Sequence, residues 1–232
     1  MRRRHNRNHR MSPRTTVYTS IIGTRDSLRD DQVTEGAEFV AFVDRPFGST
    51  LWSEKSAYAQ FRSKRRNARA PKILAHQFID ANFSVWIDGS VGLRVPAGRL
   101  VTEWLGDFDL AVFAHPKRSC TYEEALECST RALDLPELLI AQTKAYAERG
   151  FPAGWKLAET TIIVRRHGPQ MERFNNHWWS EVCRHSVRDQ VSFMYSARAT
   201  GLKLNLLTGN VRRHSYLDVL RRRAEPEPVE ER

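Results

Sequence analysis

Short apolar runs alternate with amphipathic helical patterns along this chain, and that alternation limits its fold more than any other feature. Strands joined by crossover helices form a mainly parallel sheet with helices packed on its faces. We therefore expect one α/β domain with such a sheet. The expected strands are TTVYTSIIGT (15–24), EFVAFVD (38–44), FSVWID (83–88), LAVFAHP (110–116) and ETTIIVRR (159–166).

Helix signals lie between these runs. Thr121 and Glu124 have the spacing of a capping box, Pro136 suits a first helical position, and Gly150 suits a helix stop. A further helix should begin near Arg188. One more is indicated by apolar residues that recur on a single face, namely Met171, Phe174, Trp178 and Val182.

The chain length of 232 residues fits a single domain, which we place at 15–220. Residues 1–14 contain six Arg and no acid, with almost nothing apolar to bury, so we expect a disordered basic tail. Residues 221–232 are rich in Arg, Glu and Pro and are expected to form a second, charged tail.

The formal net charge of +10 comes mainly from two places, the N-terminal tail and a basic segment at 62–72. This distribution suits an anionic ligand at one site better than a broad nucleic-acid surface. Pro71 suggests a helix that begins at this residue and continues through Phe78, with the basic segment forming the loop before it. Arg69 and Lys72 would then lie at an anion-favouring N-terminus, although an ordinary solvated surface is the alternative.

The three cysteines, Cys120, Cys128 and Cys183, have neither metal-like nor redox-like spacing. No run approaches the length of a membrane span, and no apolar core of a signal peptide follows the Arg-rich start. These features predict a cytoplasmic protein in a reducing compartment.

Two of the predicted strands end in an acidic residue. Asp88 follows FSVWI and precedes Gly89, and Asp44 follows EFVAFV. Acids at strand ends lie at the carboxyl edge of the sheet, where open α/β folds bind ligands, and a carboxylate there can hold a divalent cation against a diphosphate. Both residues are also compatible with simple turn caps.

Other polar residues stand at predicted element boundaries. His115 closes a strand, and the nearby Arg118 makes contact with an anion or a sugar plausible, although a lone strand-end His is more often structural. Arg188, Asp189 and Gln190 open the last helix, where an acid in the first turn is also ordinary.

In order along the chain, these segments resemble a glycosyltransferase-like domain family whose plant members are associated with cell-wall and mucilage polysaccharides. The matching pieces include Tyr18-Thr19, Phe42-Val43-Asp44, Arg69 with Lys72, Trp86-Ile87-Asp88-Gly89, His115-Pro116 with Arg118, Trp178-Trp179 and Arg188-Asp189-Gln190. The resemblance implies a GT-A-like, Rossmann-like fold that binds a nucleotide-diphospho-sugar, UDP- or GDP-linked, at the carboxyl ends of its strands.

The resemblance also implies site roles. The first two strands would hold the donor's nucleoside through Tyr18, Thr19 and Asp44. Asp88 would carry Mn²⁺ or Mg²⁺, but the usual motif has two acids around one residue, and here Trp86 takes the first position. His214 is a candidate second metal ligand, or else a surface residue.

The implied reaction moves a sugar to a hydroxyl of an unknown carbohydrate, lipid or protein acceptor. Arg69, Lys72 and Arg118 would stabilise the diphosphate leaving group, and Arg188 and Gln190 would contact the donor. The candidate catalytic residues are Asp189 and Glu159, as alternative bases, and His115.

Three other interpretations remain open from the sequence. The basic segments would suit a nucleic-acid-binding protein, but no recognisable reading module is present. Part of the resembling family carries a ceramidase label, which suggests a hydrolase, but neither a nucleophile elbow nor a zinc-helix motif occurs. A catalytically silent family member is the third alternative.

Overall fold

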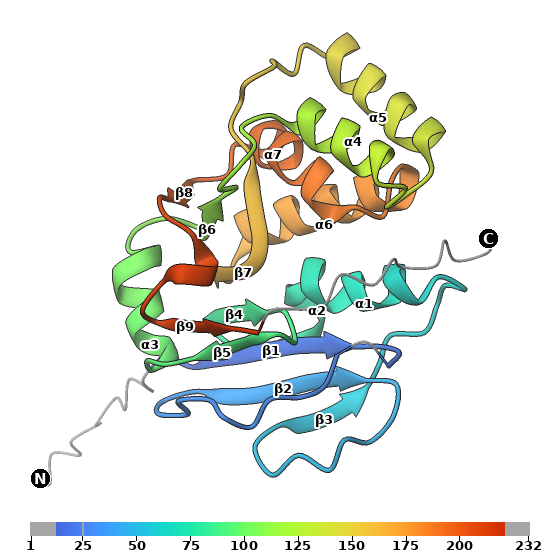
Figure 1. The fold of residues 1–232 in the computed structure, drawn as a ribbon. Coiled ribbons are helices and arrows are strands. Elements are labelled where there is room, and N and C mark those ends of the chain that lie inside the picture. Colours follow the sequence, from blue (N-terminus) through green and yellow to red (C-terminus); the bar gives the residue numbers. More distant parts are fainter. Residues whose placement is uncertain (1–12, 25, 221–232) are drawn as a thin grey trace, which may run out of the picture.

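The computed structural model describes residues 13–24 and 26–220 (Figure 1). The predicted tails at 1–14 and 221–232 lie outside these residues, apart from Pro13 and Arg14. Arg14 contacts the domain: its carbonyl accepts the N–H groups of Asn82 and Phe83, each at 3.1 Å, and its guanidinium lies 2.9 Å from Asp80. The boundary predicted after Arg14 therefore falls inside the domain.

A seven-stranded sheet in the order β3-β2-β1-β4-β7-β6-β8 forms the centre of the domain (Figure 1). Neighbouring strands are parallel except for β7, which is antiparallel to both β4 and β6. The predicted mainly parallel α/β sheet is thus confirmed, with β7 as the exception. The strands are β1 (Thr15–Ile21), β2 (Glu38–Val43), β3 (Ser53–Ser56), β4 (Phe83–Ile87), β6 (Leu110–Ala114), β7 (Ala158–Arg166) and β8 (Leu204–Leu207).

Beside this sheet, β5 (Val91–Leu93) pairs with β9 (Leu217–Val219) in a two-stranded antiparallel sheet. The five predicted strands correspond to β1, β2, β4, β6 and β7, and all are confirmed. The other four strands were not predicted. They have three or four residues each.

Helices pack on the sheet and extend beyond it, with α4 and α5 at the end far from β3 (Figure 1). The helices are α1 (Lys64–Ile73), α2 (Ala75–Phe78), α3 (Ala97–Leu100), α4 (Thr121–Thr130), α5 (Pro136–Glu148), α6 (Pro169–Arg184) and α7 (Asp189–Thr200), with a π-helical turn η1 (Val101–Leu105) and a 3-10 turn η2 (Val211–Arg213). The predicted helices at 136–150, around Met171 to Val182 and after Arg188 are confirmed. In the part of the chain that the structure describes, no helix has the length and apolar character needed to cross a membrane.

Two cores lie on opposite faces of the sheet, because successive strand residues point to opposite sides. Tyr18 of β1 belongs to a core with Phe174 and Trp178 of α6. Its neighbour Val17 belongs to a second core, with residues of α3, η1 and β5 such as Leu100. The carboxyl edge of the sheet lies between these two packed faces.

The prediction that Pro71 opens a helix is wrong. Helix α1 begins seven residues earlier, where the Ser63 hydroxyl caps it by accepting the Arg66 N–H at 3.2 Å. Pro71 is tolerated near the end of α1 because it removes only one late helical hydrogen bond. Arg69 and Lys72 consequently lie in the C-terminal half of a helix, so the anion-favouring N-terminus does not explain their position.

The predicted capping box is also wrong. Helix α4 begins at Thr121 itself, with Cys120 as the N-cap residue. The Glu124 carboxylate turns instead to Arg118, whose Nε lies 2.5 Å away. The attraction of a nearby guanidinium therefore takes precedence over the local cap.

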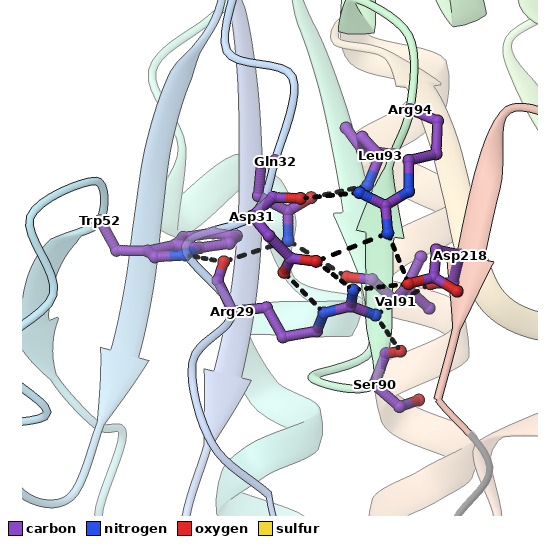
Figure 2. Close-up of polar contacts among 9 residues, drawn as sticks. All are labelled: Arg29, Asp31, Gln32, Trp52, Ser90, Val91, Leu93, Arg94 and Asp218. Atoms are coloured by element: carbon purple, nitrogen blue, oxygen red, sulfur yellow. Dashed lines mark hydrogen bonds and ion pairs between the residues drawn. The ribbon is translucent and has the colours of Figure 1, made fainter.

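A buried arginine connects the loop after β1 to the small sheet (Figure 2). Arg29 pairs with Asp31 at 2.5 Å and with Asp218 at 2.7 Å, and it donates to the carbonyl oxygens of Ser90 and Asp218, each at 3.1 Å. Only 7% of its side chain is exposed. Since carboxylates and carbonyls surround it, this guanidinium has little freedom to move.

Gly92→Ala is expected to lower the free energy of unfolding by about 1–3 kcal/mol, as overpacking of a filled interior does. The added Cβ would lie 2.9 Å from Nη2 of Arg29, which its partners hold in place. Urea denaturation measures the change. Gly98→Ala in α3 is the control, because its Cβ would meet nothing within 4 Å, and we expect it to raise stability by about 0.5–1 kcal/mol. Equal effects of the two variants would contradict this packing.

Candidate active site

Most of the predicted site residues gather at the carboxyl edge of the sheet. Asp44 follows β2, Asp88 follows β4 and His115 follows β6. Because β7 runs antiparallel to its neighbours, its first residues, including Glu159, lie at this same edge. Asp189 enters from the first turn of α7.

The centre of the site is a buried ion pair between Lys72 of α1 and Asp189 of α7. Lys72 Nζ lies 2.7 Å from Asp189 Oδ2, and the two side chains are 3% and 6% exposed. The Thr160 hydroxyl of β7 lies between them, accepting from Lys72 and donating to Asp189, each at 3.1 Å. Arg69 Nε donates to the other carboxylate oxygen of Asp189 at 2.9 Å. Both oxygens of Asp189 are therefore occupied.

Burial alone would keep Asp189 protonated, but the positive charges of Arg69 and Lys72 outweigh it and hold the pKa of the carboxyl well below its usual range. Its backbone is also fixed, since its carbonyl accepts from Trp178 Nε1 at 2.9 Å. An ionised carboxylate with two cationic partners is a poor proton acceptor. We therefore assign Asp189 to positioning Arg69 and Lys72 rather than to the predicted role of base.

Asp88 combines a turn with a half-exposed carboxylate. Its carbonyl accepts the Val91 N–H at 2.9 Å, so the residue opens a turn. Its Oδ1 accepts from Trp86 Nε1 at 2.9 Å and lies 3.7 Å from Lys72 Nζ, while 30% of the side chain is exposed. The carboxylate is thus held at the site surface beside a cation.

Glu159 differs from the other acids in having one oxygen without a partner. Its Oε1 accepts weakly from Thr161 at 3.4 Å, whereas Oε2 is buried and has no hydrogen-bond partner among the described residues. Burial raises the pKa of Glu159, the charge of Arg212 opposes that rise, and Asp88 adds to it. A carboxylate with a raised pKa and a spare oxygen suits proton acceptance.

His115 and Arg118 form a turn after β6. His115 Nδ1 accepts the Arg118 N–H at 2.9 Å, and burial together with the Arg118 charge lowers the pKa of its imidazole. The guanidinium of Arg118 is paired with the buried Glu124. Both side chains therefore have structural partners, and the structure gives no further reason to place His115 in catalysis.

The predicted nucleoside contacts are mostly interior. Tyr18 is fully buried, and its hydroxyl accepts from Arg165 at 2.5 Å, so it supports the site from beneath instead of facing a donor. Thr19 is 1% exposed. Asp44 accepts the Gly23 N–H at 2.7 Å, which ties the ends of β2 and β1 together, and it keeps 31% of its side chain exposed.

The remaining predicted donor and metal residues have different surroundings. Arg188 occupies the N-cap position of α7 without a side-chain cap hydrogen bond, and its charge contributes to the low pKa of Asp189. Gln190 follows in the first turn and is partly exposed. The His214 ring packs edge-on against Trp104 and Phe113, at centroid distances of 5.0 and 5.5 Å.

The predicted metal pair of Asp88 and His214 does not fit a metal centre. No group of three His, Cys, Asp or Glu side chains capable of holding an ion occurs within residues 13–24 and 26–220. Asp88 already faces the Trp86 and Lys72 donors, and His214 Nδ1 accepts the Tyr216 N–H at 3.2 Å. We therefore derive no step through a protein-bound metal.

Three residues that sequence reasoning missed shape the site: Thr160, Trp178 as a hydrogen-bond donor, and Arg212. In the sequence, Thr160 does not differ from an ordinary strand residue. Trp178 fits the apolar face of α6, so its position gives no sign of a hydrogen-bonding role. Only the basic dipeptide Arg212-Arg213, just ahead of His214, is a signal that could have been noticed.

Asp189→Asn is expected to lower the free energy of unfolding at pH 7 by about 3–5 kcal/mol, since it leaves buried cations without their counter-charge. Folding lowers the pKa of Asp189, so its contribution is complete above the unfolded-state pKa of about 3.9 and disappears as the pH falls through the lower folded-state value. The difference in the free energy of unfolding between variant and wild type should therefore become smaller below about pH 4. Urea titrations at several pH values measure it. Asp80→Asn, at a 96% exposed side chain, is the control and should change little; a constant gap down to pH 2 would contradict the assignment.

Comparison with known proteins shows which family the chain resembles. The chain matches the model of the TOD1/MUCI70 glycosyltransferase-like domain over residues 53–219. It is 32% identical over 141 residues to the probable hexosyltransferase MUCI70 of Arabidopsis thaliana, covering 56% of this chain and 24% of that protein. It is 29% identical over 142 residues to the alkaline ceramidase TOD1 of the same plant, covering 56% and 30%. The chain thus spans less than a third of the length of these relatives.

The fold itself has a solved counterpart. The apo structure of the bifunctional glycosyltransferase WbbM matches with a TM-score of 0.53 at 10% identity, covering 86% of this chain and 40% of that chain. At this identity the likeness concerns the fold alone, and it confirms the glycosyltransferase-like architecture that the sequence predicts. Because the family model covers well over half of the chain, the protein belongs to the TOD1/MUCI70 glycosyltransferase-like domain family.

Proposed function

We propose that this domain transfers a sugar from a nucleoside-diphosphate donor to an acceptor hydroxyl at the carboxyl edge of its sheet. The observation that carries the proposal is the meeting of Asp88, Glu159 and the Arg69–Asp189–Lys72 cluster at that edge, from four separate elements. Family membership supports glycosyl transfer in general. The nucleotide donor and the acceptor class are inferences from the charges.

Arg69 is the cation of the cluster best placed to meet a diphosphate. Its side chain is 21% exposed, whereas Lys72 is 3% exposed and lies deeper. Burial opposes its charge, but Asp189 and Asp88 raise the pKa of Arg69, so it stays cationic. A fixed guanidinium stabilises the negative charge that develops on a departing diphosphate without having to reorganise.

Glu159 would serve as the base. In the proposed step its carboxylate takes the proton of the acceptor hydroxyl while the hydroxyl oxygen forms a bond to the sugar's anomeric carbon. The bond from that carbon to the donor phosphate oxygen breaks, and the nucleoside diphosphate leaves with the electron pair. The buried, unpartnered Oε2 and the raised pKa of Glu159 support this role.

The basic segment at 62–72 offers less support for nucleic-acid binding than its charge suggests. Arg65 donates to the Leu133 carbonyl at 2.7 Å, and Arg66 lies over the Phe61 ring at 5.4 Å. Arg69 and Lys72 are committed to Asp189. Cations with internal partners gain less from phosphate contacts than free ones do.

Donor binding is tested by a thermal-shift panel of UDP- and GDP-sugars, with and without manganese. A ligand that binds only the native state should stabilise it by about 2.7 kcal/mol at 100 times its dissociation constant. If no nucleotide-sugar raises the melting temperature at millimolar concentration, donor binding is refuted. Release of a fatty acid from ceramide in place of sugar transfer would favour the hydrolase alternative.

Glu159→Gln is expected to reduce sugar transfer by a factor of about 10²–10⁴, the usual contribution of a general base, with little change in melting temperature. In the wild type the rate should rise with pH through a pKa above the ordinary value for Glu of about 4.3. Steady-state assays across pH measure both effects. Glu148→Gln, at an exposed position of α5, is the matched control; equal activity of the two variants would remove Glu159 from the reaction.

A further inference from the structure

Residues 210–219, near the end of the described chain, form a turn and then the second strand of the small sheet. We call this segment the C-terminal strap; it contains η2 and β9. Strand β9 pairs with β5, which begins three residues after Asp88. The strap is therefore connected to the same edge as the candidate active site.

Arg29 and Arg94 anchor the far end of the strap through Asp218 (Figure 2). Each guanidinium lies 2.7 Å from Asp218 Oδ2, and Arg29 also donates to the Asp218 carbonyl at 3.1 Å. The two arginines hold the pKa of Asp218 below its usual range. The loop after β1 thus fixes a strand that lies 189 residues further along the chain.

The near end of the strap is seated against β6. Val211 is fully buried in the core that contains Phe113, and the His214 ring packs against Phe113. Phe113 is paired with Glu159 across the β6–β7 register. The turn between Val211 and His214 consequently sits next to the proposed base.

Arg212 lies in that turn. Its backbone N–H is fixed by the Asn210 side chain at 2.9 Å, and the residue is exposed. Its charge opposes the rise that burial causes in the pKa of the Glu159 carboxyl. Among the described residues, Arg212 has no ion-pair partner, unlike Arg69, Arg94 and Arg118.

We propose that Arg212 is a donor-binding residue that contacts the anionic diphosphate, and that the Arg29–Asp218 pair holds it in position through the strap. The inference rests on the proposed function, because it assumes that a nucleoside diphosphate binds at this edge. It adds a cation on the side of the site opposite α1. The diphosphate would then lie between Arg69 and Arg212, with Asp88 and Glu159 at the reacting end.

The test is isothermal titration of the full chain with UDP, GDP and inorganic pyrophosphate. Losing one charge-assisted contact should weaken binding of the diphosphate probes about tenfold or more in Arg212→Ala, and Arg212→Lys should recover part of it. Arg213→Ala, at the exposed neighbouring residue, is the matched control and should bind as the wild type does.

Asp218→Asn separates positioning from direct contact. It leaves Arg212 in the chain but removes the charge that anchors the strap, so probe affinity should fall severalfold. Amide exchange should quicken in β9 and at Arg94, just after β5, whose N–H donates to the Tyr216 carbonyl at 2.9 Å. Melting temperatures on the same samples show whether the domain remains folded.

The possible outcomes are distinguishable. If the wild type binds a diphosphate probe and Arg212→Ala binds it equally well, the role of Arg212 is refuted while the proposed function stands. If Arg212→Ala weakens binding but Asp218→Asn, with faster exchange in β9, does not, the positioning role of the anchor is refuted. If the wild type binds none of the three probes, both this inference and the proposed function fail.

Discussion

The buried ion pair between Lys72 and Asp189 is the interaction on which the rest of the site depends. It joins α1 to α7 across the first residues of β7, and Thr160 bridges the two charges. Charges removed from water are tolerated only when their hydrogen bonds are satisfied, so this pair restricts where the surrounding elements can lie. Arg69 and Asp88 take their positions from it, one paired with Asp189 and the other 3.7 Å from Lys72.

Around this centre, the two buried carboxylates Asp189 and Glu159 differ in their partners. Both oxygens of Asp189 are paired with cations, which lower its pKa, whereas Glu159 has an unpartnered oxygen and a raised pKa. The pKa values of these two carboxyls at one sheet edge are therefore shifted in opposite directions. This difference suits one carboxylate to positioning cations and the other to accepting a proton. In the proposed arrangement, Arg212 of the strap supplies a second positive charge for the leaving group.

Much of the fold could be predicted from the sequence, because β1, β2, β4, β6 and β7 are apolar runs whose residues fill two cores. The short strand β3 could not, since Ser53–Ser56 has the sequence SEKS and only pairing with β2 makes it a strand. The helix start predicted at Pro71 is wrong because the helix begins earlier, at the Ser63 cap, and contains Pro71 near its end. In the site, Asp88 and Asp189 stood out as acids at element boundaries. Their surroundings depend on Lys72 and Thr160, which are brought close only by tertiary packing.

A crystal structure of the protein with a bound nucleoside diphosphate tests the central claim most directly. The expected result is a diphosphate at the carboxyl end of β4 and the amino end of β7, within hydrogen-bond distance of Arg69, with the Lys72–Asp189 pair intact beneath it. A nucleotide bound elsewhere on the molecule, or bound here only after Lys72 has separated from Asp189, would contradict the claim that this buried pair organises the site.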